Sequence, residues 1–379
     1  MHDGSARALD PAGFRFGIEH EVAFLDHRGR FADFSCTRFG DFQHIVDALP
    51  AYPGDHGQLR VGDAGIKRKR WYVEGFERFA DDPTPIDCVP KGIEIRTGIH
   101  GSITGAVGEL GASLALLRRA ARGVGYTRVG VSFNPFRTAF VPSPALNAYE
   151  LAQRRTCPEM QTAEITMLTY GPDLNLSHPQ LDAAAVVAAA RKLTACSPFV
   201  VPFSFGSPFY GGGLWHGLSP RTYLRTGARP AALAYVAEAR DLRRAQPSLT
   251  KLARLPAEVG RIEFKAFDSC AAPSGYAPLL ALLKGVLVDT TLPARADVPD
   301  GALHRRAARH GFDDGTIARG AGEILAAAQR ALRGDPDGAL LDELRAGLGA
   351  RRTPAHALRR RFDAATDLNA RLAELAAAP

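Results

Sequence analysis

Carboxylate side chains recur inside short runs that are otherwise apolar. In residues 14–26 apolar residues alternate with Glu19 and Glu21, so a β-strand would place both carboxylates on one face, about 7 Å apart. Single acidic residues occupy similar places in three later runs, namely Glu74, Glu94 and Glu263. Carboxylates this close repel and raise one another's pKa unless a cation neutralises them. Hard divalent cations take oxygen ligands, and Mg²⁺ usually brings substrate phosphates with it.

Basic and amide side chains share the polar face of these runs. Arg96 lies two residues after Glu94 and Lys265 two residues after Glu263, while Asp173 and Asn175 alternate with leucines. A half-solvated antiparallel sheet with its polar residues outward produces the same alternation. The pattern alone favours that simpler interpretation over a metal site.

Other familiar catalytic devices are missing from the sequence. No GxxxxGK[ST] loop, no GxGxxG between a strand and a helix and no GxSxG elbow occurs. The five cysteines are odd in number and show no CxxC spacing, which argues against a disulfide framework and a zinc ribbon. His20 adjoins the acidic pair but falls on the apolar face of its strand, so we expect a structural role. No general base is identifiable.

The elements that must position these residues mix strands and helices without regular alternation. We expect strands over 14–26, 70–79, 91–98, 127–136, 167–178 and 261–269, and helices over 107–125, 181–195 and 273–292. This order predicts an α+β fold with a mostly antiparallel sheet. Residues 1–300 form the expected catalytic domain, and the Ala/Leu/Arg-rich residues 301–379 form a helical C-terminal extension packed on it.

Composition is that of an ordinary globular protein. The chain has 379 residues, 46% hydrophobic and 23% charged, and its 47 Lys and Arg against 40 Asp and Glu give a net charge of +7. The basic residues are spread along the chain in short runs at 66–70 and 359–361, which favours a solvated surface over a nucleic-acid site. Part of the charge could instead meet an anionic small substrate such as a nucleotide. No apolar run approaches the roughly 20 residues of a membrane helix and no secretory signal is visible, so we expect a soluble cytoplasmic protein with no membrane or nucleic-acid partner.

The order of these segments resembles the glutamate–cysteine ligase family of ATP-dependent carboxylate–amine ligases. Residues 17–26 resemble the family's opening strand, where a Glu-x-Glu pair begins the metal site, and residues 69–76 and 91–98 resemble its next two acidic strands. Residues 205–227 resemble a segment with Ser-x-Arg, and residues 261–269 a late strand with Glu-x-Arg. Each motif alone is weak, but their order and spacing are kept from about residue 14 to 290.

The resemblance implies a glutamine synthetase-like fold: a curved, mostly antiparallel sheet forming a funnel-shaped active site, with helices outside. ATP would enter from one end and the amino-acid substrates from the other, with two or three Mg²⁺ ions between them. By the same resemblance, the metal ligands would be Glu19, Glu21, Glu74, Glu94 and Glu263. Arg221, Lys265 and Arg96 would act in catalysis, and Arg221, Lys265 and Asn175 would contact ATP.

Three departures from the family pattern bear on the substrates. Lys265 stands where the family has arginine, which keeps the charge but loses the bidentate fork. Asp173-Leu-Asn175-Leu-Ser177 replaces Gln-x-Asn-Leu-Asp, and Gly206-Ser-Pro-Phe209 replaces Asn-Ser-Pro-Phe. These departures leave open whether glutamate and cysteine are the substrate pair.

The implied activity is a ligase that joins a carboxylate to an amine through an acyl phosphate, giving an amide, ADP and phosphate. Three alternatives remain open: a phosphotransferase of the same fold acting on a carboxylate or guanidino group, a non-catalytic nucleotide- or amino-acid-binding regulator, and a nucleic-acid binder that uses the basic segment near residue 70. The expected partners are small molecules, and an oligomer is possible.

Overall fold

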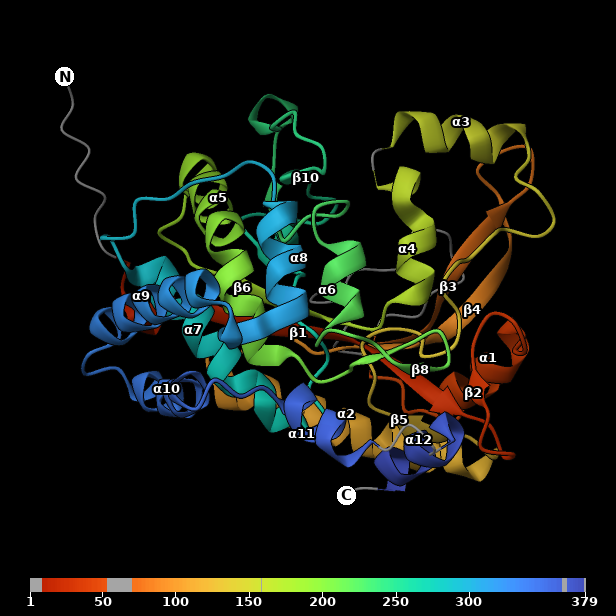
Figure 1. Ribbon diagram of the computed structural model, residues 1–379. Helices are drawn as coiled ribbons and strands as arrows, with labels where there is room; N and C mark the ends of the chain where they lie inside the picture. Colours follow the sequence, from red (N-terminus) through yellow and green to blue (C-terminus); the bar gives the residue numbers. More distant parts are fainter. Residues whose placement is uncertain (1–8, 53–69, 158, 363–366, 378–379) are drawn as a thin grey trace.

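A curled, mostly antiparallel sheet organises the molecule (Figure 1). The computed structural model describes residues 9–52, 70–157, 159–362 and 367–377. The main path of the nine-stranded sheet runs β10-β9-β11-β6-β1-β4-β3, with β2 and β5 also paired to β1, and β10 with β9 is its parallel pair. Its strands are β1 Arg15–Leu25, β2 Phe31–Ala32, β3 Trp71–Phe79, β4 Pro85–Arg96, β5 Thr127–Val129, β6 Pro172–Ser177, β9 Ala232–Val236, β10 Thr250–Leu252 and β11 Ile262–Phe264. A separate hairpin pairs β7 Phe209–Tyr210 with β8 Gly213–Leu214.

Helices cover the apolar face of the sheet. The long helices α2 and α5 pack directly on it, α2 against β1 and β4 and α5 against β9 and β11, and α7 joins the two. The shorter α3 and α4 adjoin β3 on the other side, and α4 also contacts α6 (Figure 1). The described helices are α1 Phe39–Asp47, α2 Ile103–Gly123, α3 Ala148–Thr156, α4 Ala163–Leu168, α5 Ala183–Val200, α6 Pro220–Arg225, α7 Tyr276–Val288, α8 Gly301–His310, α9 Gly315–Ala331, α10 Leu341–Gly349, α11 Pro354–Arg361 and α12 Leu368–Ala377.

The alternation in the strands sets which face each side chain takes. Along β1 the side chains of Phe16, Ile18 and Val22 are buried in the main core, and Ile93 and Ile95 of β4 lie in the same core. His20 shares the apolar face, as expected, and its Nδ1 lies 2.9 Å from the hydroxyl of Tyr276. The predicted α+β class and mostly antiparallel sheet are confirmed.

Two of the predicted strands are shorter in the structure. Only Thr127–Val129 of the 127–136 run pairs with β1, because Phe133 instead forms an isolated bridge with Thr169 and the backbone of Asn134 donates to the carbonyl of Leu168. The run ends where Asn134 Oδ1 accepts hydrogen bonds from the backbone of Phe136 and Arg137 and turns the chain. The 167–178 run divides into the end of α4 and β6, which begins at Pro172. β4 is longer than predicted, since it begins at Pro85 within the turn-rich sequence.

The C-terminal helices share the main core. Ala307, Phe312 and Ile317 belong to the same buried cluster as Phe264 of β11. α7 and α9 approach closely at Gly285, where an added Cβ would lie 2.6 Å from the Cβ of Ala328. The predicted domain boundary at residue 300 stays a prediction.

One described helix, with the turn that follows it, has the length and apolar character of a membrane span. It covers Ala183–Ser204, and 67% of its most apolar window is buried inside the fold. Its contacts with β9, α7 and α9 are those of a core helix.

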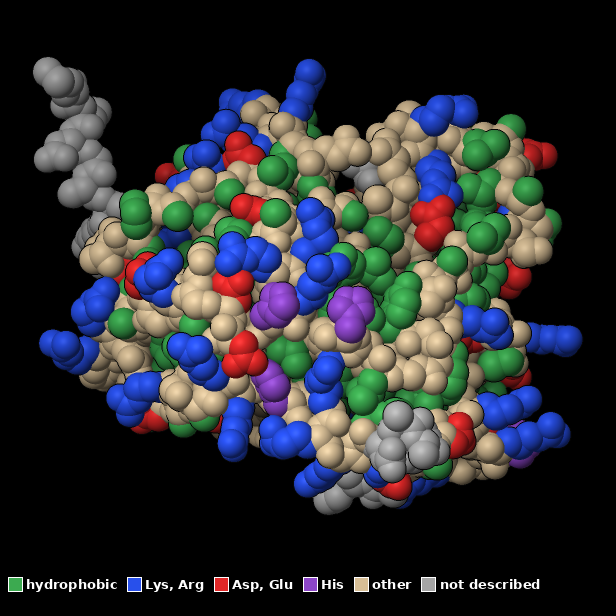
Figure 2. All heavy atoms as spheres, in the orientation of Figure 1, with side chains coloured by type: hydrophobic (Ala, Val, Ile, Leu, Met, Phe, Trp, Pro, Cys, Tyr) green, Lys and Arg blue, Asp and Glu red, His purple; other side chains and the backbone are tan. Residues whose placement is uncertain are grey.

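The basic residues are distributed over the surface. On the face shown in Figure 2, lysines and arginines are scattered among acidic and apolar side chains. Most of the basic run at 66–70 lies outside the described residues, and Arg70 pairs with Glu109.

Candidate active site

Carboxylates oppose one another directly across neighbouring strands. Glu21 of β1 is paired in register with Glu94 of β4, and Glu19 of β1 with Asp173 of β6. Like charges directly opposite each other destabilise a sheet. The fold therefore carries two unfavourable pairs side by side on one face.

These residues and two further glutamates form two compact clusters. In each cluster, which we call the first and second carboxylate clusters, one ligand oxygen per residue lies within 4.8 Å of the others. The first contains Glu19, Asp173 and Glu263, and the second contains Glu21, Glu74 and Glu94. All five glutamates predicted as metal ligands fall in these clusters, while their role as ligands stays a prediction.

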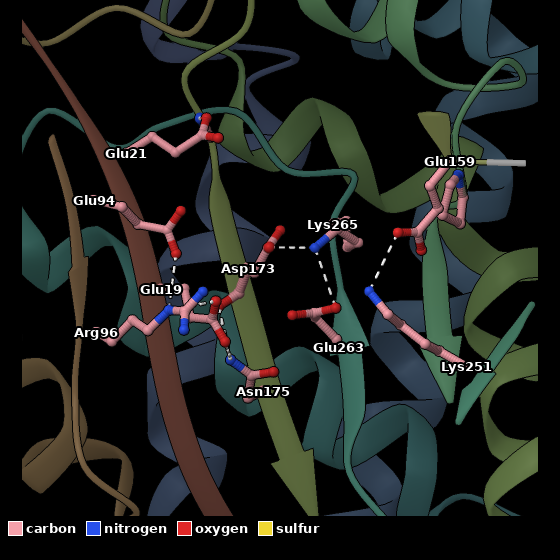
Figure 3. Close-up of polar contacts among 12 residues, drawn as sticks. Glu19, Glu21, Glu94, Arg96, Glu159, Asp173, Asn175, Lys251, Glu263 and Lys265 are labelled. Carbon is pink, nitrogen blue, oxygen red and sulfur yellow. Dashed lines mark hydrogen bonds and ion pairs between the residues drawn. The ribbon is translucent and has the colours of Figure 1, made fainter. Parts of the chain in front are cut away.

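Cationic side chains lie against the first cluster (Figure 3). Arg96 Nε lies 3.1 Å from Glu19 Oε2, and Arg261 Nη1 lies 3.1 Å from Glu19 Oε1. Lys265 Nζ pairs with Asp173 and lies 3.1 Å from Glu263 Oε2. The first cluster is thus partly neutralised by the protein itself.

A buried lysine anchors one member of the second cluster. Lys91 Nζ donates to Glu21 Oε1 at 2.6 Å and to the carbonyls of Thr166 and Thr169, and the backbone N–H of Gly171 donates to Glu21 Oε2. Arg96 Nε also reaches Glu94 Oε1 at 3.2 Å. The Glu21 carboxylate is therefore fixed in position by Lys91 of β4 and by the segment after α4.

Two tyrosines fix the arginines. The guanidinium carbon of Arg96 lies over the ring of Tyr72, 4.6 Å from the ring centroid. Arg96 Nη2 also donates a hydrogen bond to the Tyr72 hydroxyl at 2.6 Å. Arg261 lies 4.0 Å from the centroid of Tyr235, whose hydroxyl donates to Glu263 Oε2 at 3.0 Å. Cation–π contact and hydrogen bonding together restrict both guanidinium groups.

The pKa values of the carboxylates separate according to their neighbours. Burial raises the pKa of Glu94 well above its usual range, despite Arg96 and with Glu74 adding to the rise. Burial also raises the pKa of Asp173, to about 6, against the opposing effect of Lys265. For Glu19 burial acts in the same direction, but Arg96 and Arg261 outweigh it and hold the pKa below its usual value. The clusters thus contain both readily ionised and reluctantly ionised carboxylates.

Both clusters line one large cavity. Its volume is about 440 Å³, within the roughly 300–1,000 Å³ of small-molecule sites. Beside the acidic floor, the cavity has a basic wall and an apolar wall, the latter including Phe76, Tyr149 and Met160. The basic wall comprises Arg221, Arg225, Arg229, Lys251 and Arg254. This combination suits a ligand with apolar and anionic parts.

Arg221 lines this cavity, and its guanidinium also braces the end of β11. Its Nη1 donates to the carbonyl of Phe267 at 2.6 Å and its Nη2 to that of Lys265 at 2.9 Å. A Cβ at Gly171 would lie 2.1 Å from Arg221 Nη2, so only glycine leaves room for the guanidinium. Arg221 thereby holds the backbone of Lys265 in place, and its predicted contact with a phosphate stays a prediction.

Asn175 lines a smaller pocket at the start of β1 and not the large cavity. Its Nδ2 is 3.5 Å from Glu19 Oε1, and it is paired in register with Glu263 of β11, so it adjoins the first cluster. Arg96 and Glu19 line both the pocket and the cavity, whereas Lys265 lines only the cavity. The predicted contact of Asn175 with ATP stays a prediction.

Several residues of the site were not predicted from the sequence. Asp173 was noted on the polar face but not assigned to the metal site, although it alternates with Asn175 as Glu19 does with Glu21. Arg261 precedes Glu263 and Lys265 at the same spacing of two, a signal that could have revealed it. Lys91 carried no signal, since its partners come from distant segments.

Comparison with protein-family profiles shows which family the chain belongs to. Residues 15–227, more than half of the chain, match the sequence profile of glutamate-cysteine ligase family 2. The chain belongs to this family. The matched residues include every member of the two carboxylate clusters except Glu263, which lies after residue 227. A search of curated proteins found no match.

Solved structures of ligases share the fold of this glutamate–cysteine ligase family member. A bifunctional glutathione synthetase from Pasteurella multocida is similar over 97% of this chain and 52% of its own, with a TM-score of 0.62 and 13% identity. A glutamate–cysteine ligase from Francisella tularensis, in complex with AMP, matches over 97% and 88%, with a TM-score of 0.56 and 12% identity. The ligase PafA, in complex with the prokaryotic ubiquitin-like protein Pup, matches over 96% and 72%, with a TM-score of 0.54 and 14% identity.

These similarities bear on the fold alone. At 12–14% identity they confirm the curled, mostly antiparallel sheet with helices outside that was expected from the family resemblance. The family member spans about half the length of the bifunctional enzyme that it matches.

Proposed function

We propose that this protein is an ATP-dependent ligase that joins a carboxylate to an amine. The observation that carries the proposal is the pair of carboxylate clusters on the floor of one 440 Å³ cavity, beside a basic wall, in a chain of the glutamate–cysteine ligase family. A solvated sheet would leave these acids exposed, whereas Glu94 and Glu263 are only 7% and 3% exposed.

The donor set fits divalent cations. Each cluster offers carboxylate oxygens from three residues, the ligand type that Mg²⁺ prefers, and each contains a cross-strand pair of like charges that a cation would neutralise. Among the described residues, no third group of this kind accompanies the two. We therefore assign one Mg²⁺ site to each cluster, and a third ion is not part of the proposal. Bound Mg²⁺ would neutralise the phosphate charges of ATP.

The protein's own cations act on the transferred phosphoryl group in the first step. A substrate carboxylate oxygen attacks the γ-phosphorus, the bond to the β–γ bridging oxygen breaks, and ADP leaves with the electron pair. Lys265 and Arg96 line the cavity at the clusters, where their fixed charges would stabilise the anionic transition state. Arg221 holds the backbone of Lys265 in place, and Tyr72 holds Arg96.

The second step forms the amide. The amine lone pair attacks the acyl carbon, the carbon–oxygen bond to phosphate breaks, and the leaving phosphate accepts the proton that the amine loses. Phosphorylation is needed because a free carboxylate would have to expel hydroxide or oxide, which are poor leaving groups. The substrates are small molecules in this proposal, and the enzyme acts in the cytoplasm, where its five free cysteines stay reduced.

The proposal is tested by ADP release from the purified protein with ATP and Mg²⁺ over pairs of amino acids and small carboxylates, with mass spectrometry of products. We expect ADP and an amide only when both substrates are present, and ADP with an acyl hydroxamate when hydroxylamine replaces the amine. An acyl hydroxamate without amide formation for any amine would favour the phosphotransferase instead. If no pair of substrates in the panel released ADP, the result would favour a non-catalytic regulator that binds a nucleotide or an amino acid.

A further inference from the structure

Two arginines on the basic wall of the large cavity have no acidic partner. They are Arg225 at the end of α6 and Arg229 just after it, and we call them the arginine pair. The backbone N–H of Arg229 donates to the carbonyl of Arg225 at 2.9 Å, which holds the two residues together. Neither side chain forms an ion pair with a carboxylate of the described residues, whereas Lys251 of the same wall lies 3.2 Å from Glu159 Oε2.

Most hydrogen-bond donors of the arginine pair are unused by the protein. Arg225 is only 3% exposed, yet its one side-chain hydrogen bond within the described chain runs from Nη1 to the carbonyl of Pro230 at 3.0 Å. Arg229 Nη1 donates to the carbonyl of Glu159 and to Thr162 Oγ1, and its Nε is buried without a partner. A guanidinium has five N–H donors, and buried charges are ordinarily paired. The arginine pair therefore calls for an anionic ligand.

The electrostatics of Arg225 place this ligand near the carboxylate clusters. Burial lowers the pKa of Arg225 well below its usual range, and Arg221 and Arg229 add to the fall. Asp173 and Glu21, one from each carboxylate cluster, act on the pKa of Arg225 in the opposite direction. A group bound at the arginine pair would therefore share the cavity with the reacting carboxylate.

The phosphates of ATP have other partners in the proposed function. Mg²⁺ ions at the two clusters would neutralise them, and Lys265 and Arg96 would act on the transferred phosphoryl group. The arginine pair is not needed for either task. Its charge remains for a second anionic group, carried by the substrate whose carboxylate is activated in the same cavity.

The same charges disfavour an ammonium group beside that second anion. In an α-amino acid the ammonium and the carboxylate are attached to one carbon, so an α-carboxylate at the arginine pair would hold the ammonium against two guanidinium groups. Like charges this close repel strongly in a buried site. Two further acids of the cavity are already held by cations and cannot offset the repulsion. Glu150 pairs with Arg78 at 2.7 Å. Glu159 pairs with Lys251.

We propose that the arginine pair binds a second anionic group of the carboxylate substrate, and that this substrate is a dicarboxylate or a phosphorylated carboxylate without an ammonium group beside that anion. The inference rests on the proposed ligase function and names the chemical class of its acyl donor. It separates this chain from a ligase that acts on glutamate. Carboxylate and phosphate groups both accept paired hydrogen bonds from a guanidinium, so the experiment includes one probe of each kind.

The experiment measures binding by isothermal titration calorimetry in Mg²⁺, with and without the β,γ-imido analogue of ATP. The probes are glutarate, glutamate, butyrate and 4-phosphonobutyrate. Glutarate is glutamate without its ammonium group, butyrate is glutarate without its second carboxylate, and 4-phosphonobutyrate carries a phosphonate in place of that carboxylate. We expect glutarate or 4-phosphonobutyrate to bind at least about tenfold more tightly than glutamate and butyrate. The tighter of the two identifies the second anion.

Variants of the arginine pair test its role directly. Arg225→Met and Arg229→Met should each weaken binding of the tighter probe about tenfold or more, because each removes a charged donor. Arg319→Met on the exposed surface of α9 is the matched control and should leave binding unchanged. Without ligand, Arg225→Met should melt no lower than the wild type, since it removes a buried cation that has no anionic partner. A purely structural arginine would give the reverse, a lower melting temperature with unchanged binding.

The proposal is overturned if glutamate binds as tightly as the tighter of glutarate and 4-phosphonobutyrate, if neither of these two binds, or if both arginine variants bind them as the wild type does. Loss of probe binding in the presence of the ATP analogue would assign the arginine pair to the nucleotide and would also overturn it. ADP release separates this failure from failure of the ligase function. Amide formation with glutamate but with neither of the two preferred probes would refute the arginine pair alone. Probe binding without ADP release in the presence of any amine would refute the ligase alone.

Discussion

At the scale of single residues, the opposed carboxylates define the chemistry. Glu21 faces Glu94 and Glu19 faces Asp173 across the sheet, and arginine and lysine offset only part of the charge. Burial raises the pKa of Glu94 well above its usual range, so a cation bound at this cluster would favour the ionised form.

Replacing one glutamate of a carboxylate cluster by glutamine should impair Mg²⁺-dependent activity while the protein still folds. We expect Glu94→Gln and Glu19→Gln to lower Mg²⁺-dependent ADP production about 100-fold or more, because each removes an oxygen ligand. Steady-state ADP release and far-UV circular dichroism measure the two effects. The matched control is Glu323→Gln on the exposed surface of α9.

The two variants should also differ in stability without metal. Glu94→Gln removes a carboxyl that burial disfavours, so its melting temperature in a chelator should equal or exceed that of the wild type. Glu19→Gln leaves Arg96 and Arg261 without their shared partner and should melt earlier. Near-normal turnover in both variants would rule out the metal assignment.

Lys265 tests whether charge or shape matters at the position where the family has arginine. Lys265→Arg keeps the charge facing Asp173 and Glu263, so we expect activity within about tenfold of the wild type. Lys265→Met leaves both carboxylates without this cation and should reduce kcat about 100-fold. Wild-type kcat in the methionine variant would show that Lys265 has no part in the reaction.

At the scale of elements, a buried aspartate joins α6 to the end of β11. Ser219 Oγ donates to Asp268 Oδ1 at 2.9 Å and accepts from the backbone of Thr222, which caps α6 and so places Arg221. Burial raises the pKa of Asp268 to about 7, although Arg221 opposes the rise. Below about pH 7 the protonated form of Asp268 is therefore favoured in the folded protein.

Asp268 should make stability fall as pH rises. Because its folded pKa exceeds the unfolded value of about 3.9, its contribution is most favourable below about pH 4 and is lost as pH rises through about 7. Urea unfolding at pH 5 and pH 8 should show a loss in the wild type larger by about 1 kcal/mol or more than in Asp268→Asn. Equal pH dependence in the two proteins would contradict the assignment.

Elements with strong periodicity were predictable from the sequence, and short or irregular elements were not. The period of two in β1 predicts Glu19 and Glu21 on one face and His20 in the core, and the structure agrees, although the two glutamates belong to different carboxylate clusters. α4 and α6 have six residues each, too few for a helical period to appear. The ion pair of Glu19 with Arg261 joins residues 242 positions apart, so no local pattern could reveal it.

At the scale of the whole molecule, the C-terminal helices and the sheet depend on one core. Gly285→Ala would place a methyl group 2.6 Å from the Cβ of Ala328 and 2.9 Å from its Cα. The resulting overpacking of α7 against α9 should lower stability by about 1–3 kcal/mol. If residues 301–379 unfold together with the sheet, calorimetry will show a single transition moved to lower temperature.

The control for this prediction is Gly108→Ala, which adds a methyl group on the open side of α2. A second transition in Gly285→Ala, with the sheet melting at its original temperature, would instead establish the C-terminal helices as a separate unit. Enzymatic activity measured below the transition should be unchanged, since Gly285 lines neither the cavity nor the small pocket.

The net charge of +7 does not show how the charged residues are distributed between the surface and the cavity. The surface of Figure 2 mixes both signs, whereas the floor of the cavity gathers six carboxylates. The net charge of the whole chain therefore reflects the surface and does not indicate the acidic site.

The ion pairs of Glu19 have a consequence for the yield of the proposed reaction. Glu19, Arg96 and Arg261 line both the large cavity and the smaller pocket, and each arginine lies 3.1 Å from Glu19, so these pairs occupy the region that the two spaces share. In the proposed reaction, water that reached the acyl phosphate would hydrolyse it, and ATP would be consumed without formation of the amide. A variant that lacks either arginine would open the shared region to water, so we would expect it to hydrolyse more ATP for each amide that it forms.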